Sequence, residues 1–251
     1  MSTVNRELHS PILDSPTTAS SPTEHGGNSV PNLMIWKSLH NSMQPSTDMA
    51  TEFCPNSAQA ELISERLIRQ HLQLLPGFSD KDIQNTSAKI CREMDGHRKI
   101  FAILVLVGVP ARIRHFLSSQ PSVSDADLPF TKKEHGPGGA QVYRHGDSVN
   151  PLKCFNSLWN RLEINRFLEF QWKFLAPSFS RGAEKPVIDQ RFEPEIILPF
   201  SWKSLGQGSG GEVFRAEIHP SHHSFGIEMV SIAPLIRPID SHALEIVLTI
   251  F

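Results

Sequence analysis

One uninterrupted run of eight apolar residues, Ile100–Val107 (IFAILVLV), constrains the fold most. A run of this kind is buried on all sides, either as an inner strand or as an inner helix. It is far shorter than the roughly 20 residues that a membrane-spanning helix needs. The flanking segments on both sides have a helical hydrophobic period, and no strand-like segment lies nearby in the sequence to pair with it. We therefore predict that it forms the central helix of a bundle, which Gly108 and Pro110 would end.

Segments with a helical period lie on both sides of this run. Ser57–Leu75 repeats apolar residues at three-, four- and seven-residue steps, which predicts one long amphipathic helix. A second helix is predicted to begin at Ser79 or Asp80 and to run to Met94, with Met94 among its buried residues. Phe155–Leu175 predicts the most aromatic helix of the chain, with its rings as buried anchors. Between these segments, Gln120–Asn150 is rich in Gly, Pro and Asp and predicts a long loop.

The N-terminal part of the chain has a different composition. Ser2–Pro31 is dense in Ser, Thr, Pro and Gly and has few apolar residues to offset the roughly 1–2 kcal/mol per residue that ordering the backbone costs. We therefore predict that residues 1–50 form a disordered tail. Ser-Pro steps at Ser10, Ser15 and Ser21 are either sites for a proline-directed kinase or simply typical of disordered tails. Composition favours the second interpretation.

Charge and cysteine content exclude several classes of protein. The 24 Lys and Arg against 26 Asp and Glu give a formal net charge of −2. This near-neutral charge argues against electrostatic binding of nucleic acid or an anionic membrane by the chain as a whole. Cys54, Cys91 and Cys154 are too scattered, and odd in number, for a disulfide framework. Met1–His9 has no apolar core like that of a signal peptide. We expect a cytoplasmic or nuclear protein that is not secreted and has no nucleic-acid or membrane partner.

The hydrophobic period changes to that of strands after a linker over residues 182–194. Ile196–Phe200 leads into Trp202–Leu205, and Glu212–Ile218 alternates between polar and apolar residues after a glycine cluster. This pattern predicts two short strands joined by a Gly-rich turn. The predicted fold class is α+β: the disordered tail, a mainly α-helical region over residues 51–180, and then a short β-hairpin.

The glycine cluster is the one motif that indicates a chemistry. It reads G-x-G-x-x-G, which binds dinucleotides between a strand and a helix, or ATP phosphates between two strands. The alternation after the cluster favours the two-strand context. Because glycine has no Cβ, backbone N–H groups can approach phosphate oxygens, while flanking apolar residues can close on the base. The candidate nucleotide-binding residues are Leu205, Gly206, Gln207, Gly208, Ser209, Gly210, Gly211 and Val213.

Leu205–Ala216, spaced L-G-x-G-x-x-G-x-V-x-x-A, resembles the opening of a eukaryotic protein kinase domain. More closely, Leu198–His223, Lys99–Leu106 and Phe167–Pro177 are similar to uncharacterised protein-kinase-domain proteins of filamentous fungi, which carry a helical region before the kinase domain. The resemblance covers roughly residues 60–223. It implies that ATP is the nucleotide, with Mg²⁺ in a complete family member, and that the family activity is phosphorylation of Ser or Thr in a protein substrate. It also implies that residues 195–251 are the start of a truncated kinase domain with an atypical tail.

The chain departs from this family at the catalytic groups. No lysine follows Lys203, and neither H-R-D nor D-F-G occurs in the sequence. Arg237 is followed by Pro238, which argues against a regular strand there. Family members have an aromatic residue where this chain has Gly210. We therefore name no catalytic residue and no metal ligand, and expect this chain not to phosphorylate a substrate. The alternative is that the helical region acts as a non-catalytic protein-interaction or regulatory module.

Two further clusters allow a functional and a structural interpretation. His219, His222 and His223 lie close together as in a metal site, but without cysteine or carboxylate partners a surface turn is favoured. A basic group could bind a phosphopeptide, although a solvated helix end is the favoured interpretation. Its members are Arg112, Arg114, His115, Lys132 and Lys133.

Overall fold

The computed structural model describes residues 30–46, 50–134, 140–180, 187–208, 211–224, 235–240 and 243–249. Its α-helices are α1 (Val30–Ser42), α2 (Asn56–Leu62), α3 (Glu65–Gln73), α4 (Asp80–Ile90), α5 (Arg98–Val107), α6 (Ile113–Leu117) and α7 (Arg161–Phe170). Its strands are β1 (Gln44–Pro45), β2 (Glu52–Phe53), β3 (Phe130–Glu134), β4 (Ala140–Arg144), β5 (Val187–Phe192), β6 (Phe200–Gly208), β7 (Gly211–Ile218), β8 (Leu235–Asp240) and β9 (Ala243–Thr249). The predicted α+β class is confirmed.

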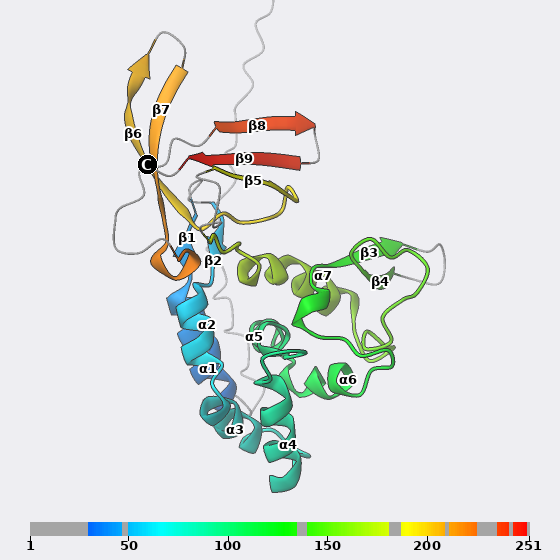
Figure 1. Cartoon of the computed structure of the whole chain (residues 1–251). Helices are drawn as coiled ribbons and strands as arrows, with labels where there is room; N and C mark the ends of the chain where they lie inside the picture. Colours follow the sequence, from blue (N-terminus) through cyan, green and yellow to red (C-terminus); the bar gives the residue numbers. More distant parts are fainter. Residues whose placement is uncertain are drawn as a thin grey trace, which may run out of the picture.

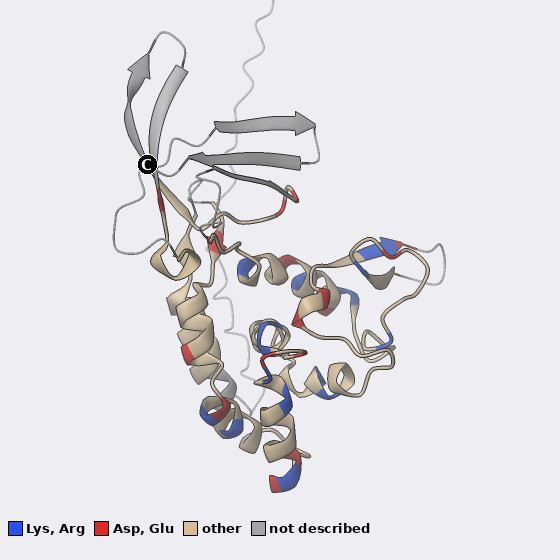
Figure 2. Ribbon diagram, in the orientation of Figure 1, with Lys and Arg blue, Asp and Glu red and all other residues tan. Residues whose placement is uncertain are grey.

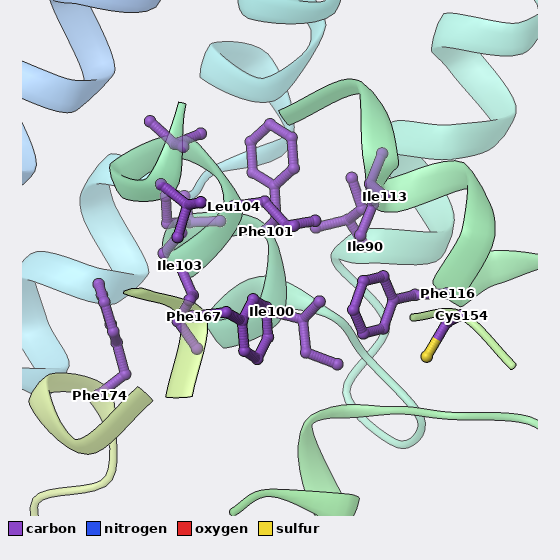
Figure 3. Close-up of a cluster of buried hydrophobic side chains, with 14 of the residues drawn as sticks. Ile90, Ile100, Phe101, Ile103, Leu104, Ile113, Phe116, Cys154, Phe167 and Phe174 are labelled. Atoms are coloured by element: carbon purple, nitrogen blue, oxygen red, sulfur yellow. The ribbon is translucent and has the colours of Figure 1, made fainter. Parts of the chain in front are cut away.

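The apolar run forms the central helix, as predicted. α5 contacts α1, α2, α6 and α7, and each residue of Ile100–Val105 has an exposed fraction of 0%. Figure 3 shows the α5 side chains packed among those of neighbouring elements, including Phe116 and Phe167. Gly108 ends the helix in the left-handed conformation, with φ of 90°, which an L side chain would resist. Within the described ranges, no helix combines the length and the hydrophobicity needed to span a lipid bilayer.

The start of α5 is capped from a distant loop. The carboxylate of Asp125 accepts hydrogen bonds from the backbone N–H groups of Lys99 and Ile100, both at 2.9 Å. These amides belong to the first turn of the helix, where no intrahelical acceptor is available. Burial raises the pKa of Asp125 to about 6, although the donated hydrogen bonds and the nearby charge of Lys99 favour its ionised form. Asp125 therefore ties the loop before β3 to the most buried helix.

The prediction of one helix over Ser57–Leu75 is wrong, because the segment forms the two helices α2 and α3. The chain leaves α2 at Ile63, and Ser64 adopts an extended conformation with ψ of 152°. The break redirects the chain so that Ile63, Ile68 and Leu72 are all buried with exposed fractions of 0%. A straight helix cannot direct the whole of this wide apolar stripe into one core.

The second predicted helix begins as expected but ends earlier. Ser79 caps α4 in a capping box with Asp82, and the helix ends at Ile90. Met94 is 84% exposed, so its predicted burial is wrong. The reason is a tight turn into α5: a Cβ on Gly96 would lie 2.2 Å from the carbonyl oxygen of Arg92. Only glycine fits this close approach.

The predicted loop over Gln120–Asn150 is wrong in its middle, because β3 and β4 form an antiparallel hairpin there. Phe130 and Val142 are buried on this hairpin and supply the apolar surface that fixes it. The side chain of Gln171, with an exposed fraction of 0%, accepts from the Phe130 N–H at 2.7 Å and donates to the Phe130 carbonyl at 2.9 Å. A buried amide thus completes the backbone pairing of β3.

The aromatic segment is only partly helical. α7 begins at Arg161, after Asn160 caps it in a capping box with Glu163, and the 3-10 turn η4 (Gln171–Phe174) follows it. Phe155 and Trp159 precede the helix, yet their rings pack on Phe167, with centroid distances of 5.2 and 5.9 Å. The predicted aromatic anchors are therefore confirmed in the core for Trp159, Phe167 and Phe174, while Phe170 and Trp172 are half-buried.

The predicted disordered tail is wrong for its last part. α1 lies within residues 1–50, and its Ile35 and Leu39 belong to the same core as α5. Residues 1–29, which carry the three Ser-Pro steps, lie outside the described part of the chain. We refer to α1–α7 with their connections, residues 30–176, as the helical body.

Strands also form in segments that we expected to be irregular. β5 occupies the end of the predicted linker, and β5, β9 and β8 form an antiparallel sheet in that order (Figure 1). Arg237 lies in β8 opposite Glu245, which corrects the expectation that Pro238 prevents a strand. β8 is at the end of the strand order in this sheet, where the missing N–H of proline is tolerated, and the register shifts directly after Pro238.

Candidate functional site

The glycine cluster lies at the end of an antiparallel hairpin. β6 and β7 pair from Phe200 opposite Ile218 to Gly208 opposite Gly211. Figure 1 shows this glycine-rich hairpin extending away from the helical body. The two predicted strands are confirmed, and the glycines stand between strand and strand rather than between strand and helix.

The pairing register places four of the eight candidate residues opposite one another in two pairs, one of which is Gly208 opposite Gly211. Gly206 lies opposite Val213, and Gln207 opposite Glu212. The register shifts between Ser204 and Gly206, which makes Leu205 the extra residue of a β-bulge. A bulge increases the local twist and changes the direction of the strand at the point where the glycines begin. Ser209 and Gly210, and the side chains of residues 202–216, lie outside the described part of the structure.

The base of the hairpin is buried and packed on an aromatic residue. Phe200 and Ile218 are 1% and 8% exposed. The ring of Phe179 lies 5.4 Å from that of Phe200 and 6.3 Å from that of Phe192. Phe179 also donates its N–H to the carbonyl of His222 at 2.8 Å, and pairs in parallel with His223. Phe179 therefore joins β5, β6 and the segment after β7.

His222 is a buried structural residue, so the expectation of a surface turn is wrong for it. It belongs to the 3-10 turn η5 (Pro220–His222) and has an exposed fraction of 0%. Its Nδ1 lies 2.9 Å from the Pro177 carbonyl oxygen, and its Nε2 accepts the Asn56 N–H at 3.2 Å. Within the described ranges, no group of three or more His, Cys, Asp or Glu residues could hold a metal ion.

The members of the basic group contact other residues of the same chain. Arg112 bonds to Glu163 at 2.9 Å and lies 4.5 Å above the Trp159 ring. Arg114 bonds to the Gly77 carbonyl, and its guanidinium stacks 3.5 Å above the ring of Phe78. The other members have polar or aromatic neighbours: Lys132 bonds to Asn165, Lys133 faces Tyr143 and His115 faces Asn156. Figure 2 shows basic and acidic residues interspersed over the helical body. These contacts support a structural role over a phosphopeptide site.

The strand order differs from what the kinase resemblance implies. In a kinase domain the strand after the glycine-rich hairpin carries the phosphate-binding lysine. In the described residues β7 is followed by η5, and the next strand, β8, pairs with β9. Arg237, the basic residue of β8, pairs in register with Glu245 in that separate sheet.

Sequence reasoning missed the residues that attach the hairpin to the helical body. Asn56 and His222 are 166 positions apart, and no local pattern signals their contact. The cluster of His219, His222 and His223 is the one sign in the sequence, and it was interpreted as a surface turn rather than a metal site. Comparison of the chain with models of known families, with curated proteins and with solved structures finds no match, so the kinase resemblance stays a prediction.

Proposed function

We propose that the glycine-rich hairpin binds the phosphates of ATP through its backbone amides, as the corresponding loop of a protein kinase does. In this proposal Gly206, Gly208, Gly210 and Gly211 leave the backbone accessible to phosphate oxygens, and Leu205 and Val213 cover the adenine. The function is nucleotide binding without phosphoryl transfer.

The observation that carries the proposal is the strand–turn–strand setting of the glycines. Gly208 and Gly211 are the last pair of the ladder, and only two residues separate them in the sequence. Peptide N–H groups at such a glycine-rich turn can be directed at an anion with no side chain in the way. The bulge at Leu205 adds support, because it bends the strand just before this turn.

The lack of kinase signatures supports binding over catalysis. The lysine of V-A-I-K, the aspartate of H-R-D and the aspartate of D-F-G do not occur in the sequence. In kinases these groups hold the phosphates and Mg²⁺ and orient the attacking hydroxyl. Without them, we expect ATP to bind weakly and to leave intact.

The test is a titration of the whole chain with ATP, with and without Mg²⁺, followed by calorimetry. We expect saturable binding that weakens at least tenfold in Gly208→Val, because added side-chain bulk keeps the backbone away from the phosphates. Ser201→Ala, on an exposed residue at the other end of β6, is the matched control and should bind as the parent does. Equal affinity in Gly208→Val, or no saturable binding by the parent, would refute the proposal.

A second candidate function, a protein-interaction or regulatory module, rests on the independence of the helical body. Its main core runs from Ile35 to Phe174, and the described side chains at the base of the hairpin, among them Phe200 and Ile218, are not part of it. Because α1 contributes to this core, the module begins at residue 30 rather than 51. A fragment of residues 30–180 should give helical circular dichroism and a cooperative thermal transition. A non-cooperative melt would exclude this candidate.

A further inference from the structure

The geometry points to His222 as a latch that holds the base of the glycine-rich hairpin against the helical body and opens when its ring is protonated. The latch is independent of any nucleotide, since all its contacts lie at the base of the hairpin. It connects three chain segments: the start of α2, the loop after η4 and the turn after β7.

Only one form of the ring satisfies both contacts. The Pro177 carbonyl oxygen, 2.9 Å away, can only accept, so Nδ1 must carry the hydrogen. The Asn56 amide, 3.2 Å away, can only donate, so Nε2 must present its lone pair. The ring is therefore a neutral Nδ1–H tautomer. A second proton on Nε2 would face the Asn56 N–H, so two donors would oppose each other and one bond would be lost.

The surroundings offer a cation little compensation. The imidazole is fully buried, and Phe53 packs edge-on against it with ring centroids 5.3 Å apart. His219, in the same turn, lies 5.8 Å away ring to ring, and Lys99 of α5 adds repulsion. Segments next to this turn also carry the titratable groups Glu52, Cys54, Lys173, Glu217 and His223, and Glu52 and Lys173 form an ion pair with each other at 3.1 Å.

The direction of the pH response follows from this environment. Burial, above all, lowers the pKa of His222 below the ordinary value of 6.5, and the charges of His219 and Lys99 lower it further. The Pro177 and Ala176 carbonyls act in the opposite sense. A histidine with a lowered folded-state pKa stabilises the fold above the unfolded value, and that stabilisation is lost as the pH falls. The latch is therefore closed at pH 7.5 and opens on acidification.

Opening would release the hairpin and leave the helical body folded. Asn56 reinforces the closed state, because its Nδ2 donates to Ser178 Oγ at 2.8 Å and to the Ser221 carbonyl at 3.3 Å. The described side chains of β6 and β7, those of Phe200, Ser201, Glu217 and Ile218, do not belong to the main core of the body, so we expect that core to stay buried when the hairpin moves.

Amide hydrogen exchange of the full chain without nucleotide, at pH 7.5 and pH 5.0, tests the latch. After correction for intrinsic exchange, the β6–β7 amides should lose at least tenfold of their protection at pH 5.0, while the α5 amides should lose none. Protection of β6–β7 that does not change with pH, or an equal loss in α5, would overturn the proposal.

Two pairs of variants assign the effect to His222. His222→Gln should weaken β6–β7 protection at pH 7.5 and abolish its pH dependence, whereas the same change at the exposed His40 should not. Asn56→Pro removes the amide hydrogen that the ring accepts, at the first helical position, where proline is tolerated. Asn56→Ala keeps that hydrogen and removes only the side-chain bonds.

The Asn56 pair keeps the test decisive even if His222→Gln does not fold. We expect Asn56→Pro to flatten the pH response and Asn56→Ala to retain it at a lower overall protection. A full pH response in Asn56→Pro would contradict the latch.

Discussion

The helical body and the glycine-rich hairpin are held in place by different means. In the body, α5 is surrounded by apolar side chains, and its burial stabilises many elements at once. The hairpin is attached at its base, through Phe179, the pair Phe200–Ile218 and the hydrogen bonds of His222. The burial that holds the body together is spread over many side chains, whereas the hairpin depends on a few contacts at its base. The element proposed to bind a ligand is the one with the more adjustable attachment.

The largest expected effect is on the body. Phe167 has an exposed fraction of 0% and packs against the rings of Phe116, Phe130 and Phe155. Phe167→Ala leaves a cavity in this cluster and should lower the free energy of unfolding by about 3–5 kcal/mol. Chemical denaturation measures the loss. Leu162→Ala on the same helix, at a residue 59% exposed, should change it by less than about 0.5 kcal/mol.

The buried cap of α5 gives the body its own response to pH. With a folded-state pKa of about 6 against an ordinary value of 3.8, Asp125 contributes stability below pH 4 that is lost as the pH rises through 6. At about 1.4 kcal/mol per pKa unit, the contribution is at most about 3 kcal/mol. The free energy of unfolding of the parent, minus that of Asp125→Asn, should therefore fall between pH 4 and pH 7. A difference that rises over this range would contradict the expectation.

Loss of one helix cap should cost the body less. The side chain of Asn160 accepts the Glu163 N–H at 2.9 Å at the start of α7. Asn160→Ala leaves that amide without its partner and should lower the free energy of unfolding by about 1 kcal/mol. Asn160→Ser, which keeps a capping oxygen, should retain most of the stability in the same denaturation experiment.

The smallest expected effect on the body comes from loosening the hairpin. Phe179→Ala removes the ring that packs on Phe200 and Phe192. We expect the β6–β7 amides to exchange at least tenfold faster, while the unfolding midpoint of the helical body barely changes. A concerted loss of protection in α5 would show that hairpin and body form one cooperative unit.

Elements whose formation depends on neighbouring residues were predictable from the sequence. The apolar run over Ile100–Val107, followed by a helix-ending glycine at Gly108, correctly predicted α5. The alternation of polar and apolar residues around the glycines correctly predicted β6 and β7. Ser79 marked the start of α4. In each case the deciding signal lies within a few residues, as helix capping and strand alternation require.

Features that depend on distant contacts were not predictable. The sequence of β3 has no distinctive alternation, and its position depends on Gln171, 41 residues away. The pairing of β5 with β9 joins Val187 to Thr249. For the candidate site, the hairpin itself was predicted, but the way it is attached was not, because the contact of His222 with Asn56 has no local signal.

The hydrogen bonds of Gln171 begin a longer connection through the core. The side-chain amide of Gln171 forms hydrogen bonds with both the N–H and the carbonyl of Phe130. Two residues further along the same 3-10 turn, the carbonyl of Lys173 accepts a hydrogen bond from the Cys54 N–H at 2.7 Å. That second bond lies on the short stretch that leads from β2 into α2. The single 3-10 turn η4 therefore joins the β3–β4 hairpin to the segment that ends at Asn56 through hydrogen bonds from its first and third residues.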